Sequence, residues 1–203
     1  MARILVIAAH PDLADSRITK AVLKAARALS THHDVQVKDL YALYADYWID
    51  TAAEQQALTA AQLVVWLHPI HWYSMPPLMK LWLDEVFAFG WAYGPGGLAL
   101  HGKDLWLVCS TGGTEDAYRP DGHNRYFFDA FLTPYEQTAA LVGMRWLPPL
   151  VAHGAHRVSE ADLALHTAVF VDRLSRYPDW DEIADLEAAG GCEVPETDRP
   201  DAD

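Results

Sequence analysis

Three continuous apolar runs constrain the fold of this chain more than any other feature. They are ILVIAA at residues 4–9, LVVWL at 63–67 and LWLVC at 105–109. A strand with one wet face would alternate apolar and polar residues, whereas these runs are apolar throughout. The pattern predicts strands buried on both faces, as in a parallel sheet that helices cover on either side.

Two weaker segments complete the predicted sheet. DVQVKDL at 34–40 alternates, which predicts a strand near an edge, and MRWLPPLVAH at 144–153 is a fifth candidate that prolines interrupt near its end. The segments between the strands favour helices, which we place at residues 16–30, 51–61, 77–89, 129–142 and 159–176. Strands that alternate with helices predict an α/β fold with an open, doubly wound sheet, whose ligands bind beyond the carboxyl ends of the strands.

Composition divides the chain into a domain and a tail. The chain has 203 residues and a net charge of −13, and residues 178–203 hold ten acidic residues against one basic residue. We therefore expect one domain over residues 1–177 and an acidic tail over 178–203, disordered beyond about Leu186. The rest of the chain has no basic surplus, which argues against nucleic acid as a partner.

The chain shows no signal for export or for the membrane. No apolar run approaches the roughly 20 residues that cross a bilayer, and the start, MARILVIAAHPD, lacks the pattern of a signal peptide. Cys109 and Cys192 lie far apart in the sequence and suggest no disulfide framework. A cytoplasmic location is the expectation.

The loop after the first strand is a candidate phosphate site. It reads HPDLADSRITK from His10 to Lys20 and lacks the GxGxxG pattern of dinucleotide folds. Ser16 is placed to cap the following helix, whose free N–H groups favour a phosphate, and Arg17 and His10 could add charged hydrogen bonds. The alternative is that Ser16 does no more than cap the helix.

The loop after the third long apolar run is a second candidate. It reads STGGTEDAYRPDGH, residues 110–123. Gly112 and Gly113 let backbone N–H groups approach a ligand closely, and Tyr118 and His123 could donate to a developing negative charge. The alternative is a glycine turn with a solvent-facing tyrosine.

The segment HPIHWY, residues 68–73, allows three interpretations: a metal site, a packed corner or a platform for a flat ligand. A zinc site needs three or four ligands, and His68 and His71 have no third partner nearby, so we expect no metal. The platform explains more, because backbone N–H groups of residues 70–73 would be free and Trp72 and Tyr73 offer flat faces. Prolines at 76 and 77 then suit the start of the next helix.

Several longer segments match a known family. They are AHP (9–11), Ser16-Arg17, LYALYADYWIDTAAEQQAL (40–58), HPIHWYSMPPLMKLWLDEVFAFGWAYGPGG (68–97), LHGK (100–103), STGG (110–113) and WLPP (146–149). Over roughly residues 2–176 the chain resembles the NAD(P)H quinone oxidoreductases of flavodoxin-like fold. Within that family it is most similar to the ancillary subunits of bacterial glutathione-gated potassium efflux systems. The resemblance implies a three-layer sandwich with a five-stranded parallel sheet and helices on both faces.

The resemblance also assigns roles to residues in the three loops. It implies FMN as the cofactor, with its phosphate held by His10, Ser16, Arg17, Ile18 and Thr19. Its ring would contact Ile70, His71, Trp72 and Tyr73 on one side, and Ser110, Thr111, Gly112 and Gly113 on the pyrimidine side. Tyr118 and His123 match the catalytic tyrosine and histidine of the family, although the spacing to His123 differs slightly from that of the animal enzymes.

The implied function is an FMN-dependent NAD(P)H:quinone oxidoreductase with two-electron, ping-pong hydride transfer. NAD(P)H would be the reductant and a quinone or similar small electrophile the acceptor. A homodimer is implied, with the substrate cleft completed by the second subunit near the segment FAFGWAYGPGG (87–97). The alternative is a regulatory subunit that activates a potassium efflux transporter at the cytoplasmic face of the inner membrane, and the two roles can coexist.

Two other classes fit the sequence less well. AAHPD (8–12) also begins some zinc-dependent deacetylases, but Leu13 and Ala14 stand where those have acidic residues. A one-electron flavodoxin carrier would have a hydroxyl-rich first loop, which AHPDLADSR is not.

Overall fold

The centre of the molecule is a 5-stranded sheet in the order β2-β1-β3-β4-β5, with every neighbouring pair parallel. This computed structural model describes residues 3–184 and residue 186. The strands are β1 (Ile4–Ala8), β2 (Val35–Asp39), β3 (Leu63–Pro69), β4 (Asp104–Ser110) and β5 (Arg145–Ala152). All five predicted strands are confirmed, and β2 lies at an edge, as its alternating pattern indicated.

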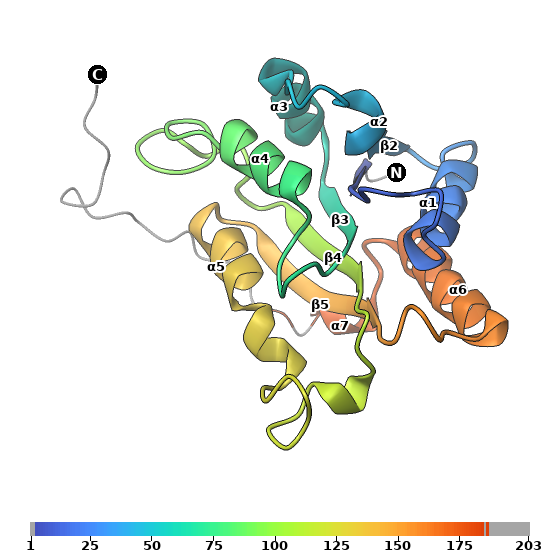
Figure 1. Ribbon diagram of the computed structural model, residues 1–203. Helices are drawn as coiled ribbons and strands as arrows, with labels where there is room; N and C mark the ends of the chain where they lie inside the picture. Colours follow the sequence, from blue (N-terminus) through green and yellow to red (C-terminus); the bar gives the residue numbers. More distant parts are fainter. Residues whose placement is uncertain (1–2, 185, 187–203) are drawn as a thin grey trace.

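Helices cover both faces of the sheet (Figure 1). On one face lie α1 (Ile18–Leu29) and α6 (Glu160–Arg176), which contact each other. On the other lie α3 (Thr51–Ala60), α4 (Pro77–Val86) and α5 (Thr133–Leu141). Within β1, Leu5 and Ile7 join the core beneath α4, while Ile4 and Val6 join the core beneath α1, so the strand is apolar throughout. Within the described part of the chain, no helix is long and apolar enough to span a bilayer.

The prolines of β5 do not end the strand. Pro148 and Pro149 lie inside it, and its pairing with β4 shifts register between Trp106 and Val108. Proline is tolerated there because β5 is an edge strand, where a missing N–H breaks no second ladder. The indole Nε1 of Trp106 donates to the carbonyl of Pro148 at 3.1 Å.

The helices α1 and α6 differ at their N-termini. The backbone N–H of Asp162 donates to the hydroxyl of Ser159 at 3.1 Å, which caps α6. The expected cap at Ser16 is wrong, because α1 begins at Ile18 and its N-cap is Arg17, with no side-chain cap bond. The first-turn N–H groups of α1 are therefore left for another acceptor. The remaining short helices are α2 (Leu40–Leu43), η1 (Glu115–Ala117), η2 (Phe128–Phe131) and α7 (Asp181–Ala184).

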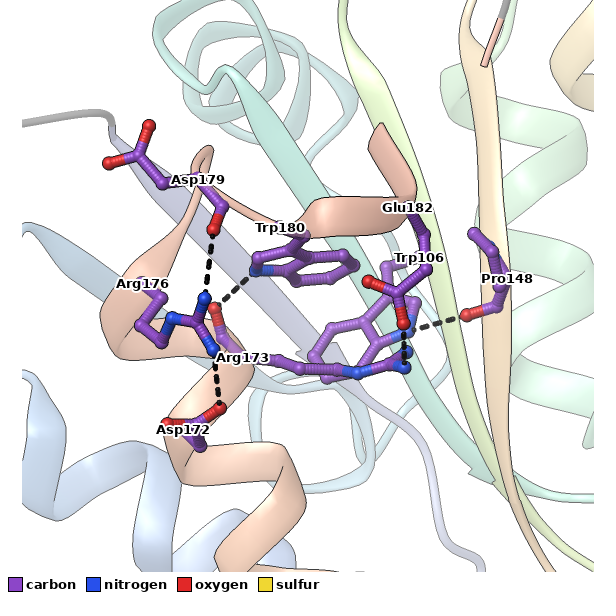
Figure 2. A network of polar contacts seen from close by, with 8 residues as sticks. All are labelled: Trp106, Pro148, Asp172, Arg173, Arg176, Asp179, Trp180 and Glu182. Carbon is purple, nitrogen blue, oxygen red and sulfur yellow. Dashed lines mark hydrogen bonds and ion pairs between the residues drawn. The ribbon is translucent and has the colours of Figure 1, made fainter. Parts of the chain in front are cut away.

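The folded domain reaches beyond the predicted boundary at residue 177 (Figure 2). Trp180 is buried and meets Trp106 edge to face at 4.9 Å between ring centroids. Its Nε1 donates to the carbonyl of Arg173 at 2.6 Å, and the Arg173 guanidinium lies over the Trp180 ring at 5.3 Å. Arg173 also pairs with Glu182 at 2.8 Å. Trp180 and its partners therefore anchor the beginning of the segment that was expected to be the tail. The predicted disorder beyond residue 186 lies outside the described residues.

Candidate functional site

Polar loop residues gather beyond the carboxyl ends of the strands, at the point where the sheet order reverses between β1 and β3. A cavity of about 430 Å³ opens there. The loops after β1, β3, β4 and β5 line it with His10, Asp12, Asp15, Ser16, Arg17, Ile18, Pro69, Ile70, His71, Ser110, Thr111, Gly112, Ala155 and His156. The volume is in the range of small-molecule sites.

A second cavity, of about 240 Å³, adjoins the first. It is lined by Ile70, Trp72, Tyr73, Gly113, Ala117, Tyr118, His123 and Asn124. Ile70 lines both cavities, and the two consecutive glycines, Gly112 and Gly113, line one each. A ligand in the larger cavity would therefore border the smaller one at this boundary.

The larger cavity is rich in nitrogen-bearing side chains. Arg17, which was expected to meet a phosphate, pairs with Glu160 of α6 at 2.6 Å. The ring of His10 accepts the N–H of Asp12 at its Nδ1, at 3.1 Å, so its proton resides on Nε2. Burial, and then the neighbouring His71, lower the pKa of His10. A neutral, donating imidazole and the uncapped start of α1 therefore face the cavity.

The loop after β3 has fewer free donors than the sequence suggested. The N–H of Ile70 donates to the carbonyl of Ser110 at 2.7 Å, and that of His71 to the carbonyl of Ser74 at 2.9 Å. Within the described residues, the N–H groups of Trp72 and Tyr73 have no such partner. The expectation of four free groups over residues 70–73 is therefore wrong for two of them.

The platform residues have an unusual backbone. Trp72 and Tyr73 have φ values of 48° and 65°, in the left-handed region that side chains rarely adopt. Trp72 is 93% exposed, whereas Tyr73 stacks on Phe131 at 5.0 Å between centroids. The Tyr73 hydroxyl donates to Asn124 at 3.3 Å, which ties this loop to the loop after β4. Strain and exposure together are typical of a ligand contact.

His68 and His71 do not act together. His68 is fully buried, donates from Nδ1 to the carbonyl of Pro69 at 2.9 Å and stacks on Tyr135 at 5.8 Å. Burial lowers the pKa of His68 to about 4. His71 is exposed and lines the cavity. Across residues 3–184 and 186, no group of three or more His, Cys, Asp or Glu residues could hold a metal ion. The packed-corner interpretation therefore fits His68, and a ligand platform at Trp72 and Tyr73 stays a prediction.

Tyr118 is buried rather than solvent-facing. It packs against Phe128, Phe131 and His153 at centroid distances of 5.2 Å, 5.8 Å and 5.4 Å. Burial raises its pKa, so the hydroxyl keeps its proton at neutral pH. His123 is exposed and lines the same small cavity. The two residues predicted to be catalytic therefore meet at one cavity, which none of the predicted phosphate-binding residues lines.

The structure brings the predicted site residues together with one exception. Thr19 lines neither cavity, because its side chain is buried on α1. The sequence reasoning missed the loop after β5, which supplies Ala155 and His156, and it also missed Asn124. A signal existed for His156, since it closely follows the fifth predicted strand and so belongs at the same sheet edge.

A parallel sheet of order 2-1-3-4-5, with a cavity at its switch point, defines a doubly wound domain, a class in which ligands bind at that edge of the sheet. Residues 2–174 match the family described as flavodoxin-like fold, and the chain belongs to that family. The predicted fold class is confirmed.

Three solved structures resemble this chain over most of its length. A protein described as a thermophilic tryptophan halogenase from Streptomycin violaceusniger is 35% identical, with 84% of this chain and 97% of that one covered and a TM-score of 0.78. General stress protein 14 from Treponema denticola, in complex with FMN, is 36% identical, with 85% and 96% covered and a TM-score of 0.76. An NADPH-quinone reductase from P. pentosaceus is 28% identical, with 84% and 96% covered and a TM-score of 0.74.

Proposed function

We propose that this protein is an FMN-dependent NAD(P)H:quinone oxidoreductase. One observation carries the proposal: a large polar cavity at the switch point adjoins a small cavity with Tyr118 and His123, and Ile70 borders both. The FMN complex of a protein 36% identical supports the cofactor, and the NADPH-quinone reductase supports the reaction.

The residues of the larger cavity fit FMN. The uncapped start of α1, with Ser16, Arg17 and the Nε2–H of His10, offers donors to a phosphate. Among the described residues, the N–H groups of Gly112 and Gly113 have no backbone acceptor, and they can bond the polar edge of a ring. Bound FMN would supply the redox chemistry, which is hydride transfer from NAD(P)H and two-electron reduction of a quinone.

The smaller cavity would hold NAD(P)H and the quinone in turn. Because it adjoins the larger cavity over Ile70, each substrate would reach the same face of a bound ring, which suits a ping-pong sequence. The buried hydroxyl of Tyr118 donates a hydrogen bond to developing negative charge, and exposed His123 delivers a proton to the reduced acceptor.

We expect a homodimer, because aromatic side chains at the smaller cavity and on the loop beside it are exposed. Trp72 is 93% exposed, and Tyr126 and Phe127 are 62% and 61% exposed. Monomeric proteins seldom expose several large apolar side chains close to a ligand cavity. A second subunit would cover them and complete the cleft. Light scattering of the purified protein tests this, and a monomeric mass would contradict it.

The function is tested by binding and by turnover. The purified chain should bind FMN and show flavin absorption bands, and it should oxidise NAD(P)H only when a soluble quinone is added. Tyr118→Phe and His123→Gln should each retain FMN but lower kcat for the quinone about tenfold or more. A folded chain that binds no FMN would overturn the proposal, and unchanged turnover in both variants would overturn the roles of Tyr118 and His123.

The regulatory role stays a prediction of the sequence resemblance. Its test is co-purification with a potassium efflux transporter, followed by transport assays with and without the chain.

A further inference from the structure

The loop that carries Gly112 and Gly113 can adopt more than one orientation of its peptide planes. Two consecutive glycines allow a peptide plane to flip at little cost, because neither residue carries a Cβ. A flip would turn a carbonyl oxygen, instead of an N–H group, toward the larger cavity. Something outside the glycines must therefore select one orientation.

The segment after β5 holds two carbonyls of this loop. The N–H of Ala155 donates to the carbonyl of Thr111 at 2.8 Å, and the N–H of Gly154 donates to the carbonyl of Gly113 at 2.8 Å. In a trans peptide the C=O and the next N–H point in opposite directions. The N–H of Gly112 therefore points away from Ala155, and the N–H of Thr114 points away from Gly154. The Gly112–Gly113 peptide lies between these two held planes, and Gly112 lines the larger cavity.

The side chain of Thr111 adds a second bond to the Gly113 carbonyl. Its hydroxyl, on a residue only 1% exposed, lies 2.7 Å from that oxygen and 2.9 Å from Nδ1 of His153. A carbonyl can only accept, so the hydroxyl proton must lie between Thr111 and Gly113. The Thr111 oxygen then accepts from His153, whose proton is fixed on Nδ1.

The ring of His153 is itself held in place. It packs against Tyr118 at 5.4 Å and edge to face against Phe128 at 5.1 Å between centroids. Burial lowers the pKa of His153, which favours the neutral ring with a single donor. The chain of bonds thus runs from an anchored imidazole through a buried hydroxyl to the carbonyl of Gly113, which closes the glycine pair on its C-terminal side.

We propose that His153 and Thr111 form a clamp on the carbonyl of Gly113, which fixes the course of the Gly112–Gly113 loop at the boundary of the two cavities, where its N–H groups would meet a flavin ring. His153 is a positioning residue, since it acts through Thr111. This inference rests on the proposed function. It predicts a contribution to ring binding that is separate from the phosphate site at the start of α1.

Thr111→Val removes the hydroxyl while it keeps the shape of the side chain. We expect the dissociation constant for FMN, from flavin fluorescence quenching, to rise about tenfold. The constant for riboflavin, which lacks the phosphate, should rise by the same factor, because the clamp acts on the ring. Thr111→Ser should stay within about twofold of the wild type. The midpoint potential of the bound flavin should become more negative in Thr111→Val, since ring-facing donors favour the anionic reduced form.

His153→Leu should weaken both ligands like Thr111→Val, and His153→Asn should restore affinity because its amide N–H₂ can donate to Thr111. His166→Leu and Thr138→Val are the matched controls. His166 is a partly buried histidine outside the clamp, and the hydroxyl of Thr138 donates to a carbonyl of α5. Both controls should bind FMN as the wild type does.

The outcomes separate this inference from the proposed function. If the wild type binds FMN but Thr111→Val and His153→Leu bind it within twofold, or lose no more than the controls, the clamp is overturned and the function stands. If the loss appears for FMN but not for riboflavin, the clamp is also overturned. If the folded wild type binds neither ligand, both proposals fall.

Discussion

The two ends of the sheet differ in how their polar groups are hydrogen-bonded. At the amino end, Asp104 of β4 and Arg145 of β5 form two bonds of 2.8 Å and 2.9 Å, and Tyr177 donates to the same carboxylate at 2.7 Å. At the carboxyl end, some loop N–H groups have no backbone partner among the residues that the structure describes, and Trp72 lies in the left-handed region. Polar groups at the amino end bond within the chain, whereas we propose that those at the carboxyl end bond a ligand. The difference separates residues that stabilise the fold from residues that serve binding.

The largest effect is expected from the amino end. Asp104→Ala would leave Arg145 and Tyr177 without their partner, and breaking a buried ion pair typically costs about 4 kcal/mol. Urea denaturation should show this loss in the free energy of unfolding, while the folded fraction binds FMN normally. Asp84→Ala, whose partner Lys80 is 56% exposed, should cost less than about 0.5 kcal/mol. Equal losses in the two variants would remove the contrast between the ends.

His68 is an exception in the comparison of the two ends of the sheet, because it lies at the carboxyl end of β3 but is buried in the core. Its folded pKa of about 4 lies below the ordinary 6.5 of an unfolded histidine. The unfolded state thus binds the proton more readily, so stability is retained above pH 6.5 and lost as the pH falls toward 4. The shift corresponds to about 3 kcal/mol.

The His68→Phe variant, which keeps the ring stacked on Tyr135, should lack this loss. Urea denaturation at pH 7, 5.5 and 4 measures the difference between variant and wild type. His32→Phe, at an exposed position, is the control and should follow the wild type. Parallel pH curves for His68→Phe and the wild type would contradict the assignment.

Arg17 tests the opposite combination, a small effect on stability with a large effect on binding. Its pair with Glu160 is exposed, with side-chain exposures of 39% and 86%, so Arg17→Gln should change the free energy of unfolding by less than about 1 kcal/mol. The dissociation constant for FMN should rise about tenfold, and that for riboflavin should not change, because the proposal places the guanidinium at the phosphate and away from the ring. Equal losses for both ligands would place Arg17 away from the phosphate.

Trp72 should show the smallest effect on stability. A left-handed residue other than glycine costs about 1 kcal/mol, so Trp72→Gly should leave the fold unchanged or slightly more stable. FMN or quinone binding should weaken, since the exposed ring is lost. Tyr47→Gly is the control, because Tyr47 has φ 65° and lines neither cavity. It should change the free energy of unfolding about as much as Trp72→Gly does, and it should leave ligand binding unchanged. A clear loss of stability in Trp72→Gly would mean that its conformation serves the fold.

Much of the fold was readable from sequence because burial leaves a local pattern. Continuous apolar runs predicted the central strands, and alternation predicted that β2 lies at an edge. The predicted tail boundary rested on the negative charge of the segment. It did not take account of Trp180, whose indole packs on Trp106. A single anchor inside an acidic segment has no periodicity that would reveal it.

The sequence predicted which loops form the candidate site, but it did not predict the hydrogen bonds within it. The ends of the predicted strands indicated which loops lie at the same edge of the sheet. The residues that the resemblance implied line one or both of the two cavities, apart from Thr19. Which N–H groups stay free depends on partners distant in sequence, such as Ser110 for Ile70. The same holds for the burial of Tyr118, which comes from Phe128, Phe131 and His153.

The amino-acid sequence alone determined a parallel sheet between helices and the edge of that sheet where chemistry gathers, because hydrophobic periodicity and turn residues act over short stretches of chain. Only the tertiary structure decided the direction of each hydrogen bond at that edge. His153 and Thr111 lie 42 positions apart in the chain, and their contact exists only once β4 and β5 are paired.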